Sequence, residues 1–439
     1  MRMFDIITHK KNGMALSEEE IRFFIKGFTK GEIPDYQASA LLMAICLKGM
    51  DESETAVLTD AMLRSGDMAD LSSIPGIKVD KHSTGGVGDK TSLIIGPVVA
   101  ACGVPVAKMS GRGLGHSGGT IDKLESIPGF KTEIAPDRFC DIVRSMGLAI
   151  IGQSGDIAPA DKKLYALRDV TATIDSLPLI ASSIMSKKLA AGSDAILLDV
   201  KTGSGAFMKS LEDSIALARA MVSIGVRSGR RVMALITDMD TPLGYAIGNA
   251  LEVEEAAALL KGQGAKDLTD VCMELAAYML YLAGAADTVE QSKELALNAV
   301  SSGKAFEKLC MMVEAQGGDI TPLHKGFAKA PVITPLKALA SGYISRMNAE
   351  DCGMASLALG AGRVYKDDCI DYLAGIILHK KTGDYVAEGE IIADLHSSAS
   401  EKVREARQML GDAIIISDKP PAAYKSVLAV VSDKEVRML

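Results

Sequence analysis

Between about residue 77 and residue 236, short apolar segments alternate with glycine-rich turns and with stretches of helical periodicity. The segments that we expect to form strands are 77–79, 104–107, 148–151, 195–199 and 232–236. Alternation of this kind is typical of βαβ units, whose strands form a largely parallel sheet. In such sheets ligands bind where loops leave the carboxyl ends of the strands. The pattern therefore predicts an α/β fold with its site in these loops.

Regions of different character flank and interrupt the alternation. Residues 1–66 look helical, because Ser17 and Glu20 form a capping-box pattern and apolar residues then recur at helical spacing. Residues from about 157 to 190 also look helical and are expected to return to the N-terminal helices. We therefore expect a helical lobe at 1–66 and 157–190, a large mixed, mainly parallel α/β lobe at 67–156 and 191–335, and a small C-terminal α+β domain at 340–439.

Charge and composition exclude several classes of function. The chain has 48 Lys and Arg against 56 Asp and Glu, a net charge of −8, which disfavours unspecific nucleic-acid binding. Apolar runs fall short of the ~20 residues of a membrane helix, and the first residues contain no signal-peptide core. The 7 cysteines are scattered and the 6 histidines lack zinc-site spacing. We expect a cytoplasmic protein that acts on small molecules.

The first glycine-rich segment, DKHSTGGVGDKTS at 80–92, follows an expected strand and opens an expected helix. Glycines let backbone N–H groups point into one concavity, and a helix N-terminus adds partial positive charge. Lys81, Ser83 and Ser92 add side-chain donors suited to phosphate. The segment is not a Walker P-loop, because Asp89 precedes Lys90 and the upstream glycine is misplaced. A plain strand-to-helix turn is the alternative; we favour an anion site.

The second glycine-rich segment, KMSGRGLGHSGGTIDKLE at 108–125, also lies between an expected strand and an expected helix. Its Gly113-x-Gly115-x-x-Gly118 matches the dinucleotide fingerprint. That interpretation is weak, because the required acidic residue about 20 positions on falls in TEIAPDRF, which looks like a helix start. Two anion loops after two strands of one sheet instead predict a single bound phosphate, either inorganic or on a sugar.

Together these segments resemble the thymidine and pyrimidine-nucleoside phosphorylase family. SGRGLGHSGGTIDKLE resembles the family signature, with Ser117 where Thr or Ala is usual, and DKHSTGGVGD resembles its phosphate loop. The likeness continues at 165–176, 181–192 and 199–209, and covers the whole chain. It implies reversible phosphorolysis of uridine, deoxyuridine and thymidine to the free base and α-D-(deoxy)ribose 1-phosphate, with inversion at C1′. It also implies a homodimer held chiefly through the helical lobe, and lobes that close to react.

The resemblance also assigns roles to individual residues. Its implied phosphate-binding residues are Lys81, Ser83, Ser92, Lys108, Met109, Ser110 and Thr120. Its implied base-binding residues are Arg168, Ser183 and Lys187; the last two are i,i+4 on one helix face, and the guanidinium offers a forked donor. We nominate His82 as the proton donor to the base, with a loop-orienting hydrogen bond as its alternative role. His82, Arg168 and Lys187 are thus the expected catalytic residues.

Members of the family that accept both uridine and thymidine also hold a potassium ion between the lobes. The matching positions are Gly88, Lys90, Leu243, Ala246 and Glu255, and Lys90 departs from the small residue that is usual there. The ion is retained if the site uses only the backbone carbonyl at 90. The ammonium would replace it if it reaches Glu255. We expect potassium and no organic cofactor.

Three other interpretations remain open at this point. An anthranilate-type phosphoribosyltransferase would share the architecture and a glycine-rich anion loop, but it would need magnesium. A strict thymidine phosphorylase would share the motifs. A non-catalytic binding module is suggested by the lipoyl-like turns around Gly383 and Gly389, although the attachment sequence Met-Lys-Met is missing there.

Overall fold

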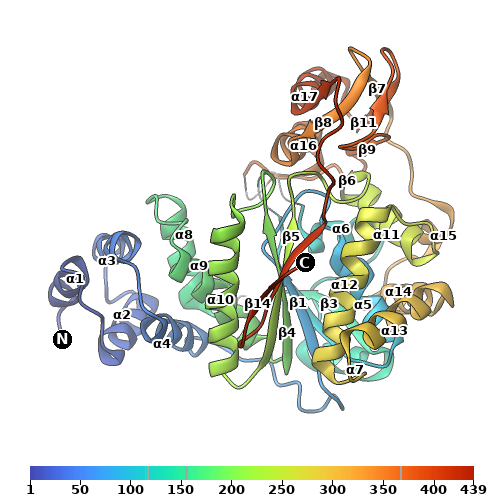
Figure 1. Ribbon diagram of the computed structural model, residues 1–439. Helices are drawn as coiled ribbons and strands as arrows, with labels where there is room; N and C mark the ends of the chain where they lie inside the picture. The colour runs from blue at the N-terminus through green and yellow to red at the C-terminus, as the bar shows by residue number, and fades with distance from the viewer. Residues whose placement is uncertain (114, 116–117, 154–156, 366–367) are drawn as a thin grey trace.

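The computed structural model in Figure 1 describes residues 1–113, 115, 118–153, 157–365 and 368–439. Its first four helices are α1 (Met3–Lys11), α2 (Glu18–Lys30), α3 (Asp35–Lys48) and α4 (Glu52–Leu63). The predicted capping box at Ser17 and Glu20 is confirmed at the start of α2. Helices α8 (Pro159–Asp169) and α9 (Leu177–Ala190) return here, since Leu164 and Leu179 share one apolar core with Phe24. These helices form the helical lobe.

The largest sheet has five strands in the order β1-β4-β5-β13-β14. Strands β1 (Val79–Ser83), β4 (Ala195–Thr202) and β5 (Arg231–Asp238) are parallel, as predicted. Strands β2 (Val106–Ser110) and β3 (Leu148–Gly152) form a separate parallel pair. Between β1 and β2 the Lys81 carbonyl accepts a hydrogen bond from the Lys108 ammonium, which lies at the division between the two sheets.

Helices cover both faces of the central sheet (Figure 1). Successive residues of β4 alternate: Leu197 packs in the core that contains α5 and α12, whereas Ile196 and Leu198 pack in the core that contains α10. The helices of this lobe are α5 (Thr91–Ala101), α6 (Thr120–Glu125), α7 (Pro136–Met146), α10 (Leu211–Arg227), α11 (Asn249–Leu260), α12 (Lys266–Ala283), α13 (Val289–Ser301), α14 (Lys304–Ala315) and α15 (Thr321–Lys325). This coverage on both faces explains the continuous apolar runs at 195–198 in β4 and 232–236 in β5.

Most of the remaining elements form a small α+β domain. They are β7 (Val332–Lys337), β8 (Gly342–Met347), α16 (Ala349–Ser356), the π-helical turn Leu357–Ala361, β9 (Gly375–Leu378), β10 (Tyr385–Val386), β11 (Ile391–Ser397), α17 (Ser400–Ala413) and β12 (Ile414–Ser417). One sheet has the order β6-β9-β11-β7, where β6 is Ala246–Gly248, and the other has the order β10-β8-β12.

The extent of this domain differs from the expected 340–439 at both ends. Strands β6 and β7 precede residue 340 yet pair within the small sheets. At the other end, β13 (Val427–Val431) and β14 (Val436–Met438) return to the central sheet, where β13 pairs antiparallel with β5 (Figure 1). The return buries Ala429 and Val431 beside Ile236 and covers the β5 edge, which would otherwise present unpaired backbone groups.

Candidate active site

A cavity of about 190 Å³ lies where the end of β1 faces helices α8 and α9. It brings together residues that the sequence places about 100 positions apart: His82 and Ser83 from β1, and Arg168, Ser183 and Lys187 from the two helices. Its full lining is His82, Ser83, Thr84, Tyr165, Arg168, Ile174, Ile180, Ser183, Ile184, Lys187, Phe207 and Leu217. The apolar walls and few converging polar groups are typical of a small-molecule site.

Lys187 enters this cavity from α9 with its ammonium already oriented. Its Nζ lies 2.6 Å from Asp161 Oδ2 and 3.2 Å from the Ser183 hydroxyl, one helical turn earlier. The Asp161 side chain is 4% exposed and that of Lys187 is 26% exposed, so the pair has one buried end and one end open to the cavity. The ammonium is thereby held in place for an electron-rich group of a ligand.

Arg168 has a structural task in addition to its expected one. Its guanidinium donates to the carbonyls of Thr173, Ile174 and Leu179, at 3.2, 2.7 and 3.2 Å. A guanidinium carries five N–H donors, so two remain for a ligand. The group also lies 5.9 Å from the Tyr165 ring centroid. Arg168 therefore shapes the loop between α8 and α9 as well as lining the cavity.

His82 is surrounded by positive charge. Burial lowers the pKa of its imidazole well below the ordinary value, and Lys188, Lys108, Lys187 and Lys81 lower it further. Its Nε2 is buried and has no hydrogen-bond partner among the described residues. The imidazole is therefore neutral near pH 7, and a proton donor role would require a bound anion to raise this pKa.

The other expected phosphate residues of the first loop lie in a dense charged network. Lys81 Nζ donates to Thr91 Oγ1 at 2.6 Å and pairs with Asp199 at 2.8 Å. The Ser83 hydroxyl donates to the carboxylate of Asp89. Burial alone would raise the pKa of Asp89, but Lys81, Lys201 and Lys123 outweigh burial and hold it well below its usual value. These contacts hold the first glycine-rich loop in place through its buried side chains.

The second cluster of expected phosphate residues is distributed around β2. Lys108 Nζ lies 3.4 Å from Asp80 Oδ1. Burial and the nearby Lys188 and Lys81 lower the pKa of Lys108 to about 8, although the Asp80 carboxylate acts to raise it. Met109 lines a different cavity, of about 610 Å³, that also contains Gly152 and Gln153. Ser110 ends β2, Thr120 begins α6, and Ser92 lies in the first turn of α5. Ser117 of the signature is outside the described residues.

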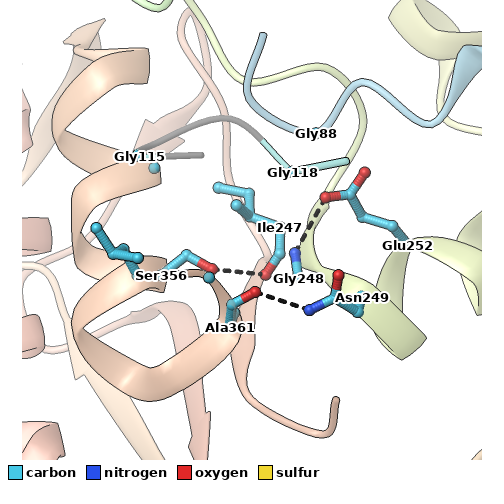
Figure 2. Close-up of a pocket in the computed structure, with 12 residues that line it drawn as sticks. Gly88, Gly115, Gly118, Ile247, Gly248, Asn249, Glu252, Ser356 and Ala361 are labelled. Carbon is cyan, nitrogen blue, oxygen red and sulfur yellow. Dashed lines mark hydrogen bonds between the residues drawn. The ribbon is translucent and has the colours of Figure 1, made fainter. Parts of the chain in front are cut away.

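The two glycine-rich loops meet at a second, smaller pocket, shown in Figure 2. Glycines of both loops line it together with Glu252, which lies beside Gly118, and with Ser356 and Ala361 of the C-terminal domain. Its volume of about 20 Å³ suits a water molecule and not a phosphate ion. Lys123, which follows the second loop, donates to the Asp89 carbonyl at 2.8 Å and pairs with Glu252 at 2.7 Å. Both loops line this pocket, although β1 and β2 belong to separate sheets and not to one sheet as expected. The pocket is too small to be the anion site.

The expected potassium ligands are also brought together, around an ammonium group. Lys90 Nζ donates to the carbonyls of Leu243 and Ala246 at 2.8 and 2.9 Å, and to Glu255 Oε2 at 2.6 Å. Gly88 lies against the same segment, because a Cβ there would be 2.5 Å from the Leu243 carbonyl oxygen. The residues present do not fit a potassium ion, since an ammonium already binds the oxygens that would hold it.

Three site residues were missed by reasoning from the sequence. Asp161 orients Lys187; Tyr165 lies under both cations, with Lys187 Nζ also 5.9 Å from its ring centroid; and Asp80 binds Lys108 and Lys188. Tyr165 and Asp80 lie within the segments that carry the family resemblance, but no role was predicted for either. Asp161 carried a usable signal, as an acidic residue seven positions before Arg168 on an amphipathic helix.

Comparisons with known proteins agree with the overall architecture. Residues 4–66 match the model of the glycosyl transferase family helical bundle domain, residues 76–306 its a/b domain, and residues 343–417 the pyrimidine nucleoside phosphorylase C-terminal domain. In the described part of the chain, no helix combines the length and apolarity needed to cross a membrane.

Individual relatives extend the match over nearly the whole chain. A pyrimidine-nucleoside phosphorylase of Geobacillus stearothermophilus is 56% identical over 96% of this chain and 98% of its own length. One of Staphylococcus aureus (strain MSSA476) is 56% identical over 98% of this chain and all of its own. The crystal structure of anthranilate phosphoribosyltransferase from Thermus thermophilus shares the fold, with a TM-score of 0.56 at 21% identity over 71% of this chain and 98% of that one. The chain belongs to the pyrimidine-nucleoside phosphorylase family.

Proposed function

We propose that the protein is a pentosyltransferase that catalyses the reversible phosphorolysis of pyrimidine nucleosides. The substrates are inorganic phosphate and uridine, deoxyuridine or thymidine; the products are the free base and α-D-(deoxy)ribose 1-phosphate. The observation that carries the proposal is the single cavity in which His82 and Ser83 of the first glycine-rich loop face Arg168, Ser183 and Lys187. Family membership at 56% identity over nearly the full length supports it.

The chemistry requires positive charge on both sides of the breaking bond. A phosphate oxygen attacks C1′ opposite the base, the C1′–N1 bond breaks with inversion, and its electron pair moves onto the pyrimidine ring. Lys187 and the free donors of Arg168 face the base and stabilise this developing anion. A proton then reaches the base, for which His82 is the proposed donor once phosphate has raised its pKa.

Phosphate is proposed to bind at the carboxyl ends of β1 and β2. The proposed contacts are Lys81, Ser83, Ser92, Lys108, Met109, Ser110 and Thr120. Support comes from the four lysines that depress the pKa of His82, because the same positive potential attracts a phosphate dianion. Phosphate would draw Lys81 and Ser83 partly away from Asp199 and Asp89, their partners in this structure.

We also propose a homodimer that works in the cytoplasm. Phe4, Tyr36 and Leu47 of the first helices are at least 70% exposed, and such large apolar side chains suit a subunit interface. All seven cysteines are free thiols, which suits a reducing compartment. Light scattering on the purified protein tests the dimer, and cell fractionation tests the location.

The decisive experiment is base release from uridine, deoxyuridine and thymidine, measured side by side with and without phosphate. The proposal expects release from all three, dependent on phosphate and unaffected by removal of magnesium. Release from thymidine alone would indicate a strict thymidine phosphorylase. A requirement for magnesium and a diphosphate sugar would indicate a phosphoribosyltransferase instead. No release from any nucleoside would refute catalysis and revive a binding role.

A further inference from the structure

The segment 242–246, which joins β5 to β6, is held by two ammonium groups. Lys90, at the start of α5, donates to the carbonyls of Leu243 and Ala246 at 2.8 and 2.9 Å. Lys381, from the small C-terminal domain, donates to the carbonyls of Pro242 and Gly244 at 2.7 and 3.0 Å. Two lysines from different domains thus bind alternating carbonyls of one short stretch of backbone.

Lys90 is fully used at this junction. An ammonium has three N–H donors, and Lys90 directs them to two carbonyls and to Glu255 Oε2 at 2.6 Å. Its side chain has no exposed surface, whereas that of Glu255 is 13% exposed. Burial lowers the pKa of Lys90, but Glu255 and Glu252 outweigh burial and raise it above the ordinary value. Three acceptor oxygens, one of them on the Glu255 carboxylate, surround the Nζ atom and match a charged ammonium.

The surrounding backbone is arranged around this ion pair. Glu255 accepts the amides of Tyr245 and Ala246 at 2.7 and 2.9 Å, so both of its oxygens are bound. The amide of Leu243 donates to the Val87 carbonyl at 3.1 Å, which joins the first glycine-rich loop to the same segment. Lys90 therefore connects the proposed phosphate loop to β6, the strand that pairs with β9 of the C-terminal domain.

A second cation would not be stable here. The charge of Glu255 is already matched by Lys90, and that of the neighbouring Asp267 by Lys381. A potassium ion would need oxygens that already accept from Lys90, and it would lie against a like charge in a buried site. The chain itself therefore supplies the monovalent cation at this position, as the Lys90 ammonium.

We propose that the Lys90 ammonium is the resident monovalent cation of this protein and a positioning residue for its phosphate loop, so that neither stability nor turnover depends on potassium. The residue acts through the backbone of 242–246 and the loop at 87–90, and it does not touch the proposed substrates. The proposal concerns the folded protein, and its stability test is independent of the proposed reaction.

The test compares the wild-type protein with Lys90→Thr, Lys90→Met and an exposed control, Lys266→Thr, whose side chain is 90% exposed. Thermal unfolding is followed in potassium chloride and in tetramethylammonium chloride at matched ionic strength. Wild type and Lys266→Thr should have the same Tm in both salts. Lys90→Thr, which opens the space of the side chain, should lose about 5 °C or more in tetramethylammonium and regain most of it in potassium. Lys90→Met, which fills that space, should lose stability in both salts.

Turnover and ion binding give two further readouts. The kcat/KM for phosphate should be independent of potassium in wild type and should rise about tenfold or more with potassium in Lys90→Thr. Equilibrium dialysis of the wild type against radioactive rubidium, a potassium surrogate, should detect no stoichiometric binding, and it requires no variant to fold. One bound rubidium per chain, a wild-type Tm that rises specifically in potassium, or a Lys90→Thr protein as stable as wild type in tetramethylammonium would each overturn the proposal.

Discussion

The ion pair between Lys187 and Asp161 allows a sharp test of the proposed leaving-group stabilisation. If Lys187 stabilises the developing base anion, Lys187→Met removes a charged contact made in the transition state. Removing one such preorganised donor costs about 10²–10³ in kcat, or about 2.7–4 kcal/mol. Asp161 lies 2.6 Å from the ammonium on the side away from the cavity, so it acts only by holding that group in place. We expect Asp161→Asn to cost about tenfold.

The double variant separates positioning from direct action. Because Asp161 works through Lys187, Asp161→Asn should have no further effect on kcat once Lys187 is replaced by Met. Stability should follow a different pattern. Lys187→Met leaves a buried carboxylate unpaired, which costs about 3–5 kcal/mol in a fully buried pair, and the lower end applies because Lys187 is 26% exposed. Adding Asp161→Asn removes that charge and should restore part of the loss.

The assay is the fall in ultraviolet absorbance as uridine is converted to uracil at saturating phosphate, paired with urea unfolding of the same four proteins. A Lys187→Met enzyme within threefold of wild type would refute the assigned role of the lysine. An Asp161→Asn change that lowers kcat by the same factor in both backgrounds would refute the positioning role of Asp161. A double variant less stable than Lys187→Met would contradict the unpaired-carboxylate argument.

Three further predictions concern other parts of the site. Arg168→Lys keeps the charge but cannot span the three carbonyls that the guanidinium binds, so the KM for nucleoside should rise about tenfold or more; an unchanged KM would count against the dual role. Because the pKa of His82 is lowered, its imidazole should stay neutral, and its NMR signals in the free protein should show no titration between pH 6 and 8. Adding phosphate should raise this pKa. An ordinary titration near pH 6.5 without phosphate would contradict the prediction. Gly88→Ala combines a strained φ of +71° with a Cβ that would lie 2.5 Å from the Leu243 carbonyl oxygen. It should therefore lower the Tm far more than Gly229→Ala, where φ is +74° but the space around the Cβ is open. Equal losses of Tm would show that only backbone strain matters.

Local patterns in the sequence were enough to predict several of the elements. The capping box at Ser17 and the apolar run at 148–151 depend on neighbouring residues, and both predictions are confirmed. The return of β13 to β5 could not be predicted, because its pairing depends on which sheet edge is left open after all other elements have packed. For Asp161 the sequence offered only its acidic character on an amphipathic helix, because its partner Lys187 is 26 positions away on another helix.

Lys90 shows most clearly why the chemistry of a site cannot be predicted fully from the sequence. Its lysine identity was visible as a departure from the family pattern, but the consequence depended on whether the ammonium reaches Glu255, 165 positions later. Spacing along the chain does not contain that distance. The fold sets this distance. A hydrogen bond from the Leu243 amide to the Val87 carbonyl brings the segment after β5 against the first glycine-rich loop, where the Lys90 ammonium binds the Leu243 carbonyl.

Asp80 explains how so much positive charge can be kept beside the cavity. Its two oxygens bind Lys108 at 3.4 Å and Lys188 at 2.8 Å; burial alone would raise the pKa of Asp80, but these two lysines outweigh burial and keep it below its usual value. Each lysine also donates to a backbone carbonyl, that of Lys81 in β1 or Met109 in β2, so one carboxylate joins both strand ends to α9. A lone buried lysine would lose its proton or destabilise the fold, whereas two that share one carboxylate remain oriented with a net positive charge. That surplus charge is what a phosphate dianion would neutralise on binding. The same arrangement therefore stabilises the junction of the two sheets and prepares it for an anion.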